Sequence, residues 1–138
     1  MSKAGINVAN TNSQAVTAGN PIALGTAVHR YGCKNGQPII NLVNNGIVLN
    51  ECGYYKITAN VTAAPTADGP VTVTLLQDGN PIPGARATNT AAAAGNAVSV
   101  TAIGTVKISG CNVKSVITAV LTAGTGNVTN VAVNVYKE

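Results

Sequence analysis

Residues 53–61 read Gly-Tyr-Tyr-Lys-Ile-Thr-Ala-Asn-Val, and this stretch decides the fold class. Its odd-numbered positions from Tyr55 to Val61 are apolar, whereas the even-numbered positions 56, 58 and 60 carry Lys, Thr and Asn. Alternation with a period of two is typical of a β-strand that has one face in a core and the other in water. We therefore predict a half-buried strand here.

The same period continues on both sides of this strand. Residues 71–75, 98–108 and 131–135 alternate in the same way, with a possible bend at Gly104, and residues 22–28, 39–42 and 47–49 give shorter strands. Residues 116–121 are apolar on both faces apart from Thr118, which predicts a strand covered on both sides. The Ala-rich residues 88–96 favour a loop or a weak edge strand. Tight turns are predicted at the following dipeptides: Asn35-Gly36, Asn45-Gly46, Asp68-Gly69 and Asp78-Gly79.

The composition supports an all-β domain. The chain has 138 residues, 46% of them hydrophobic but none of them Phe or Trp, and only 9% are charged. Val and Thr dominate the second half, as a pleated surface prefers. Eight to ten short strands without helices predict an antiparallel two-sheet sandwich or jelly roll. A surface so poor in charge suits a protein that is largely covered in an assembly.

The charges and the apolar runs argue against two classes of partner. Eight Lys and Arg residues against four Asp and Glu give a net charge of +4, but the basic residues are scattered along the sequence. Nucleic-acid binding needs clustered basic residues and stacking aromatics, so none is expected. No stretch approaches about 18 apolar residues, and the first residues do not resemble a signal peptide. We expect no membrane contact and synthesis in the cytoplasm.

The inventory of chemically reactive side chains is almost empty. Cys33, Cys52 and Cys111 form no CxxC pair, and a zinc site built from them and His29 would lack the usual paired spacing. A Cys–His dyad with His29 would lack an orienting third group. We expect no enzyme, no cofactor and no metal. Free thiols are favoured, and a disulfide, if one forms, would join the Gly-flanked loops at Cys33 and Cys111.

Residues 1–20 differ from the rest of the chain. They are rich in Asn, Thr, Ser and Ala, with isolated Ile6, Val8 and Val16 and no sustained period. Such a segment orders only on something it lies against. We expect an extended N-terminal arm at 1–20 and the folded domain at 21–138.

Three stretches carry a resemblance to a known family. Gly46-Ile47-Val48-Leu49, then residues 53–57, then residues 71–75 with the hairpin at 78–85, resemble the C1q/TNF-like jelly roll in its microbial and phage forms. The likeness spans about residues 21–138. The chain lacks a collagen-like stalk, and its aromatic residues are reduced to four Tyr. It most resembles short Ala/Thr/Val/Gly-rich proteins encoded among the structural genes of tailed phages.

This resemblance implies a homotrimer. Sheets of this fold trimerise by burying one face against neighbouring copies, and a closed ring leaves no unpaired edge. The two-sided strand at 116–121 and the closing strand at 131–136 are the candidates for that face. The trimer-interface candidates are Tyr55, Val116, Ile117, Val120, Leu121, Val133 and Tyr136.

The resemblance also implies a role and a place. A trimer of this type would decorate a capsid or form a head fibre, contact the major capsid protein through arm residues Ile6, Val8 and Val16, and so reside on the virion surface. The alternative is a trimeric C1q-like recognition module that binds a glycan or a cell-surface protein through its distal loops, residues 62–70 and 86–96.

Overall fold

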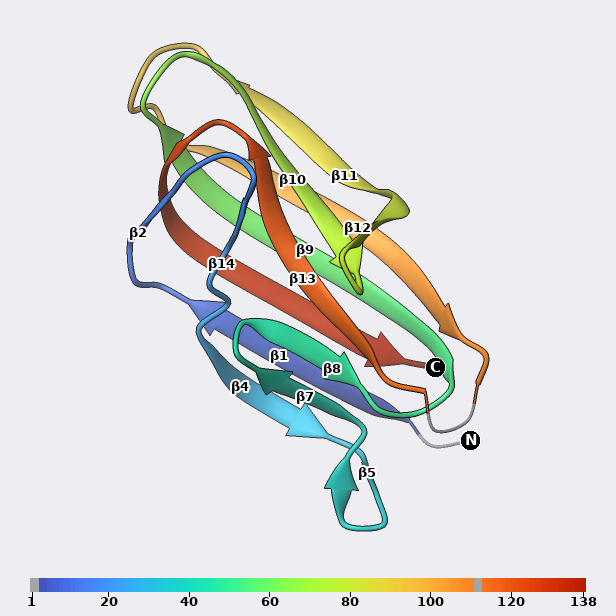
Figure 1. The fold of residues 1–138 in the computed structure, drawn as a ribbon. Helices are drawn as coiled ribbons and strands as arrows, with labels where there is room; N and C mark the ends of the chain where they lie inside the picture. Colours follow the sequence, from blue (N-terminus) through green and yellow to red (C-terminus); the bar gives the residue numbers. More distant parts are fainter. Residues whose placement is uncertain (1–2, 111–112) are drawn as a thin grey trace.

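Strands form all the regular structure of residues 3–110 and 113–138, the part of the chain that this computed structural model describes (Figure 1). No helix able to cross a membrane occurs among these residues. In chain order the strands are β1 (Ala4–Asn10), β2 (Gln14–Val16), β3 (Asn20–Pro21), β4 (Thr26–Tyr31), β5 (Cys33–Lys34), β6 (Gln37–Pro38), β7 (Ile40–Val43), β8 (Gly46–Leu49), β9 (Gly53–Pro65), β10 (Gly69–Gln77), β11 (Asn80–Ala91), β12 (Val98–Ile108), β13 (Ser115–Ala123) and β14 (Gly126–Lys137).

The strands form two antiparallel sheets that lie face to face. Sheet I has the order β12-β9-β14-β1-β4, and the short β2 pairs with the same edge of β14 as β1 does. Sheet II has the order β11-β10-β13-β8-β7, with β3 paired to β13. A small hairpin of β5 and β6 stands apart from both layers (Figure 1). The predicted all-β, two-sheet jelly-roll sandwich is confirmed.

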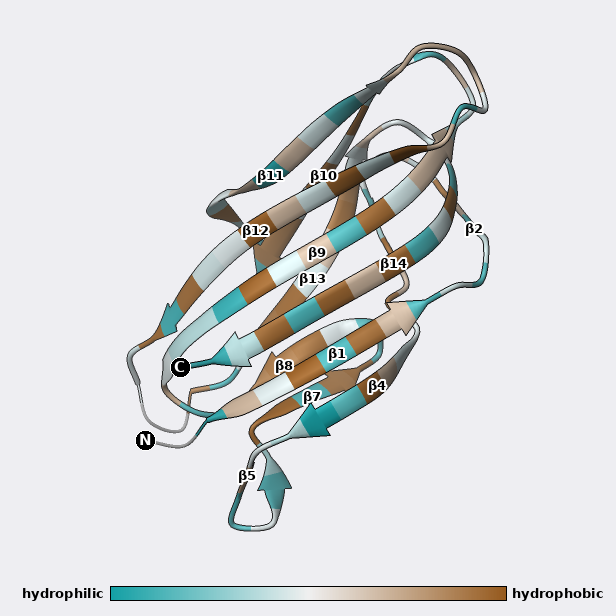
Figure 2. Cartoon of the chain, turned by 180° about the vertical axis from the view of Figure 1, so that it is seen from behind, coloured by the Kyte–Doolittle hydropathy of each residue, from teal (hydrophilic) through white to brown (hydrophobic). Residues whose placement is uncertain are grey.

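The core lies between the two layers and follows the alternation seen in the sequence. Tyr55, Ile57, Ala59 and Val61 of β9 are completely buried, whereas the side chains between them face outward. The brown and teal bands along β9 and β14 in Figure 2 show this two-residue period. Val71, Val73 and Leu75 of β10 and Val131, Val133 and Val135 of β14 close the same core from both sheets.

The predicted N-terminal arm is wrong for residues 4–10. These residues form β1, which pairs along its whole length with β14 and on its other edge with β4. Ile6 is 1% and Val8 0% exposed, and Val16 in β2 is also buried. The physical reason is that Ala4, Ile6 and Val8 alternate with small or polar residues, so one face of the segment supplies the core. Residues 4–16 are part of the folded domain.

The predicted strands are mostly confirmed, with local differences. β13 lies in the middle of sheet II, and its residues 119–121 are buried on both faces as predicted, but Val116 is 37% exposed. Residues 22–25 join β3 to β4 without belonging to a strand, although Ile22 and Leu24 are buried. The Ala-rich stretch belongs to two elements: β11 continues to Ala91, and residues 92–97 form a loop.

Several of the predicted tight turns contain residues with positive φ angles. Positive φ angles at Asn35 and Gly36 and at Asp78 and Gly79 fit type I′ hairpin turns, as predicted. The turn between β7 and β8 has positive φ angles at Asn44 and Asn45, one residue earlier than the predicted Asn45-Gly46.

β12 pairs with β9 across Gly104 without a register shift, so no β-bulge interrupts the strand there. Gly104 instead allows close packing, since a Cβ there would lie 2.8 Å from the Ala85 Cβ.

Candidate functional site

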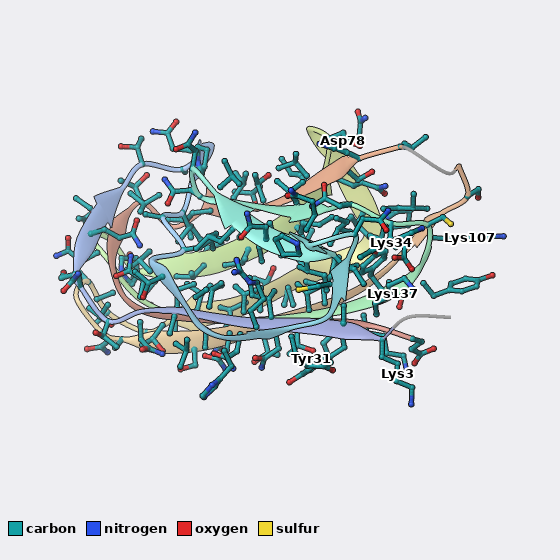
Figure 3. All side chains as sticks on the ribbon, turned by 90° about the horizontal axis from the view of Figure 1, so that it is seen from below. Lys3, Tyr31, Lys34, Asp78, Lys107 and Lys137 are labelled. Atoms are coloured by element: carbon teal, nitrogen blue, oxygen red, sulfur yellow. The ribbon has the colours of Figure 1, made fainter. Side chains whose placement is uncertain are left out.

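The two ends of the sandwich differ in chemistry, and the functional groups gather at one of them. We call it the termini end, because β1 begins there and β14 ends there. All four Tyr of the chain lie on the last rungs of sheet I at this end or beside them. The lysines lie there too, and Figure 3 shows Lys3, Lys34, Lys107 and Lys137 on the same side of the molecule.

Two exposed tyrosines pack side by side on the outer face of sheet I. Gly5 of β1 is paired with Tyr136 of β14 and with Tyr31 of β4. A Cβ on Gly5 would lie 2.5 Å from Tyr31 Cε1 and 2.9 Å from Tyr136 Cδ1, so both rings lean over the glycine. Tyr31 is 54% and Tyr136 47% exposed. The rings form an apolar surface that the subunit itself does not cover.

The rest of this outer face is polar but nearly uncharged. The Asn7 and Asn134 side chains hydrogen-bond to each other across β1 and β14. Asn60 donates to Thr101 Oγ1 at 3.0 Å, and other Thr, Ser and Asn side chains continue the ladder toward the far end of the sheet. Ile103 of β12 is 64% exposed on the same face. Such a surface carries little charge that would have to be desolvated on contact with a second protein.

The strongest electrostatic feature is a buried ion pair at the termini end. Lys137 Nζ lies 3.0 Å from Glu51 Oε1, and the two side chains are 0% and 10% exposed. The Tyr55 hydroxyl donates to the Glu51 carbonyl oxygen at 2.5 Å, which fixes the backbone next to the pair. Burial raises the pKa of Tyr55 from 10.0 to about 12. Such a pair is stable only while both charges are present.

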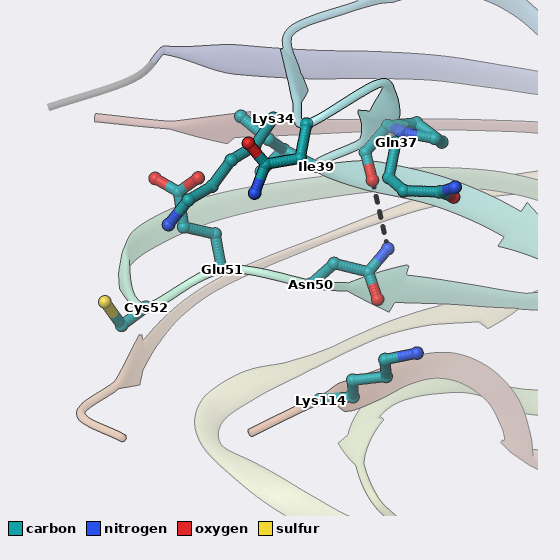
Figure 4. A pocket seen from close by; sticks show the side chains of 9 residues that line it. Lys34, Gln37, Ile39, Asn50, Glu51, Cys52 and Lys114 are labelled. Atoms are coloured by element: carbon teal, nitrogen blue, oxygen red, sulfur yellow. Dashed lines mark hydrogen bonds between the residues drawn. The ribbon is translucent and has the colours of Figure 1, made fainter. Parts of the chain in front are cut away.

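A pocket of about 340 Å³ opens beside this ion pair (Figure 4). It lies between the β5–β6 hairpin and the loop after β8. Its lining combines carboxamides, two lysines, an acid and a few apolar side chains: Lys34, Asn35, Gln37, Pro38, Ile39, Asn50, Glu51, Cys52 and Lys114. In the view of Figure 4, Lys34 and Gln37 lie on one side, Lys114 on the other, and Asn50 and Glu51 between them.

At the opposite end, which we call the distal end, few side chains are charged or aromatic. The loop after β9 and the loop after β13 meet there, as the hydrogen bond from Thr66 N to the Thr125 carbonyl shows. A pocket of about 270 Å³ lies between them and is lined by Pro65, Thr66, Ala67, Asp68, Pro70, Ala123, Gly124 and Thr125. Asp68 is its one charged residue, and none of these side chains is aromatic.

The comparisons with known proteins bear on the fold. No family model matches the sequence, and the search of curated proteins finds no match. Solved structures match over the whole domain: murine APRIL has a TM-score of 0.72 at 11% identity, covering 99% of both chains. The chain has the C1q/TNF-like jelly-roll fold. Eiger TNF from S. frugiperda matches with a TM-score of 0.70 at 9% identity, covering 99% of this chain and 91% of that one.

The globular domain of zebrafish complement 1qA protein also matches over nearly its whole length. The TM-score is 0.68 at 8% identity, and the match covers 97% of this chain and 98% of that one. Identities this low establish the shared fold, so the resemblance to C1q/TNF-like domains is confirmed at that level. The resemblance to phage structural proteins stays a prediction.

The C1q/TNF-like fold places the predicted trimer residues in three different environments. Most lie inside the subunit, and their exposed fractions are 0% for Tyr55, 1% for Ile117, 0% for Leu121 and 1% for Val133. A side chain that its own subunit surrounds cannot contact another copy, so these candidates are corrected to core residues. Val116 and Val120 face outward from sheet II, 37% and 8% exposed, whereas Tyr136 faces outward from sheet I.

The cysteines and His29 do not form a site among the described residues. Cys33 is an exposed free thiol on the β5–β6 hairpin, Cys52 is half-buried, and His29 lies exposed on β4. Cys111, the predicted disulfide partner of Cys33, falls outside the described residues. No group of three or more His, Cys, Asp or Glu side chains comes together in residues 3–110 and 113–138.

The ion pair and its pocket are the features that sequence reasoning missed. Lys137 continues the inward parity of Val131, Val133 and Val135, which is a signal that the lysine side chain would be buried. A buried lysine in turn requires an acid nearby. Glu51 itself lies in a loop and gives no periodic signal, so its partnership with Lys137 emerges only from the fold.

Proposed function

We propose that the chain is a non-enzymatic structural protein of a virion, a homotrimer that decorates the capsid or forms a head fibre. The observation that carries the self-association is the outer face of sheet I. Tyr31, Tyr136 and Ile103 are exposed there among mainly Asn, Thr, Ser and Ala side chains, with Lys56 and Lys107 at the termini end of the face. Interface centres are depleted in charged residues and enriched in aromatic ones, and this face has both properties.

The placement of the charges on sheet I favours one part of the face for the contact. Lys56, which pairs with Glu138 at 2.8 Å, and Lys107, which lies over the Tyr54 ring, are both at the termini end. The middle of the face around Thr58 and Asn134 carries no charge. A cyclic trimer would bury this middle part while leaving the lysines at the rim, where their desolvation costs least.

The proposed contact with the capsid has to use a surface other than β1. Ile6, Val8 and Val16 are committed to the core, so they are not available to grip a shell. The low charge of the whole chain and the resemblance to phage structural proteins support a covered position on a virion. Three copies acting together would convert weak single contacts into a firm attachment.

The trimer is tested by placing a charge on each sheet in turn. Thr58 and Thr118 are matched positions, because both are half-buried threonines on the outer face of a central strand. We expect the wild-type chain and Thr118→Arg to scatter light as trimers and Thr58→Arg as a monomer. A monomeric wild type, or equal loss of assembly in both variants, would refute the proposed face.

The same variants test the capsid role. Particles that lack the chain should lose heat resistance, and adding back the wild type, but not Thr58→Arg, should restore it. Restoration by the monomeric variant would show that trimerisation is not needed. No effect of the chain on particles would refute the virion role while leaving the trimer intact.

The alternative, glycan recognition through the distal loops, finds little support in their chemistry. The distal pocket is lined by Pro, Ala, Gly and Thr around Asp68, and it offers a sugar ring no aromatic side chain to stack on. The loop at 92–97 adds four Ala and Gly residues before Asn96. Recognition at this end would have to rely on Asp68, a few Thr and Asn side chains and backbone groups.

A further inference from the structure

The only histidine of the chain lies on the outer face of sheet I. His29 of β4 is exposed and pairs with Asn7 of β1, whose side chain is hydrogen-bonded to Asn134 on that face. Directly paired residues of neighbouring strands share one face, so the imidazole stands beside the Asn7 side chain. The next residue, Arg30, faces the other way and donates to Asn41 Oδ1 of β7. His29 therefore belongs to the face proposed for self-association.

Five paired residues form a row across sheet I, and His29 is its first member. We call it the central row, and from β4 to β12 it consists of His29, Asn7, Asn134, Thr58 and Ile103. The proposed contact is centred on Thr58 and Asn134 of this row. Tyr31, two residues after His29 on the same face, is 54% exposed and belongs to the apolar surface of that contact. A second copy that covers Asn134 and Tyr31 also covers His29.

Within its own subunit, His29 faces no carboxylate among the described residues. Its strand packs against β1 and β7, and neither of these strands contains an ionisable side chain. On β4 itself, Arg30 faces away and Tyr31 presents a phenol. The other side chains of the central row are two carboxamides, a hydroxyl and an aliphatic group. An imidazolium covered at this place would lose its water without gaining an opposite charge.

A second copy of the chain does not supply the missing acid. The chain has four acidic residues, and all of them lie away from the central row: Glu51 in the buried ion pair, Asp68 in the distal pocket, Asp78 in the turn between β10 and β11, and Glu138 at the termini end of the face, where it pairs with Lys56. The other charges on this face are lysines, which repel an imidazolium. Burying a charge without a partner is costly, so the contact tolerates His29 only in its neutral form.

We propose that His29 makes the assembly sensitive to acid, so that the trimer forms while the imidazole is neutral and separates when it is protonated. This inference rests on the proposed function, because it needs the outer face of sheet I to be the contact between copies. It adds to that function a condition under which the contact is released.

The direction of the effect follows from where the proton can be bound. Histidine side chains change their charge between about pH 5 and 8. A separated subunit holds the imidazolium in water, whereas the trimer buries it, so the separated subunits bind more protons than the trimer does. Acid therefore shifts the equilibrium toward separation. In the acid part of this range the association constant should fall about tenfold per pH unit for each such proton, which is about a thousandfold for three copies.

The test compares assembly at the two ends of this range. Light scattering gives the oligomeric state in a neutral condition at about pH 8 and in an acid condition at about pH 5, and far-UV circular dichroism reports whether the strands persist. We expect a trimer in the neutral condition, separated subunits in the acid condition, and the same strand signal in both. A wild type that stays trimeric in acid would overturn the role of His29 while leaving the proposed trimer intact.

Two substitutions fix the charge at this position. His29→Gln keeps a polar side chain that does not titrate, so this variant should stay a trimer in both conditions. His29→Arg is charged in both conditions and should be monomeric in both. Acid separation of His29→Gln would assign the effect to another group, and assembly of His29→Arg would show that the contact accepts a charge here. Either result overturns the proposal, as does a His29→Gln chain that fails to assemble in the neutral condition. Position 29 is exposed in the subunit, so both variants should fold.

Thr118→Arg is the control for added positive charge, because it places a charge on sheet II and leaves His29 in place. It should behave as the wild type does, trimeric in the neutral condition and separated in acid. Persistence of its trimer in acid would contradict the role of His29. Failure of the proposed function looks different, since the wild type would then be monomeric in the neutral condition already.

Discussion

The two ends of this sandwich are built from the same strands but stabilised in different ways. At the termini end, Lys137 and Glu51 are buried as ions, and the tyrosines and lysines of the chain surround them. At the distal end the chain relies on close backbone approach, as where Gly126 passes Ala64 and Pro65. Chemistry with specific partners is concentrated at the first end, whereas the second is limited to packing.

The largest effect is expected from Lys137→Met at the termini end. The substitution removes the positive partner and leaves the Glu51 carboxylate buried without compensation. Breaking a buried pair in this way costs about 3 to 5 kcal/mol, which we expect as a loss in the free energy of unfolding measured by urea denaturation.

Two further variants show whether burial is the cause. Lys56→Met breaks an exposed pair, Lys56 with Glu138, at the same end and should shift the urea midpoint little. Adding Glu51→Met to Lys137→Met removes both charges and should recover much of the lost stability. If the double variant is as unstable as Lys137→Met alone, lost packing rather than an uncompensated charge explains the effect.

A smaller effect is expected from adding one methyl group at each end. In Gly126→Ala the new Cβ would lie 2.3 Å from the Ala64 carbonyl oxygen and 2.6 Å from the Pro65 Cα, so two paired strands must separate. Overpacking of this kind costs about 1 to 3 kcal/mol.

Gly5→Ala at the termini end is the matched control. Its Cβ would meet the rings of Tyr31 and Tyr136, which are about half exposed and can turn into solvent. We expect a smaller loss of stability than for Gly126→Ala, measured in the same urea titrations. A larger loss at Gly5 would mean that the tyrosine pair is fixed, and would contradict the contrast between the two ends.

The alternation of apolar and polar residues predicts most strands, but it does not predict which residues of other strands their side chains contact. The alternation in β9, β10, β12 and β14 predicted strands, faces and buried residues because a two-residue period is a local property. β1 was missed although Ile6 and Val8 have the same spacing, since a short run among Asn, Thr and Ala looks like a linker until β14 provides an edge for it.

The candidate sites show the same limit. Tyr136 was predicted at an interface and is exposed, but Tyr55, Ile117, Leu121 and Val133 were assigned to that interface although they fill the core. An apolar residue reads the same in sequence whether its own subunit or a second copy covers it. The pocket was missed because Lys34, Asn50 and Lys114 come from three separate loops or strand ends, which only the fold brings together.

The smallest effect is a loss of folding stability at high pH, caused by ionisation of Tyr55 at the termini end. Burial raises the pKa of Tyr55 to about 12, above its ordinary value of 10.0, so folding favours the neutral phenol. This contribution to stability is fully present below pH 10 and is lost as the pH rises from 10 to about 12. Tyr55→Phe has no proton to lose, so the stability gap between wild type and Tyr55→Phe should narrow over that interval in urea titrations. The gap between wild type and Gly126→Ala should stay constant, because the Cβ clashes at Gly126 are with atoms of Ala64 and Pro65, which do not titrate. A Tyr55→Phe gap that also stays constant would show that burial of the hydroxyl does not couple its ionisation to the fold.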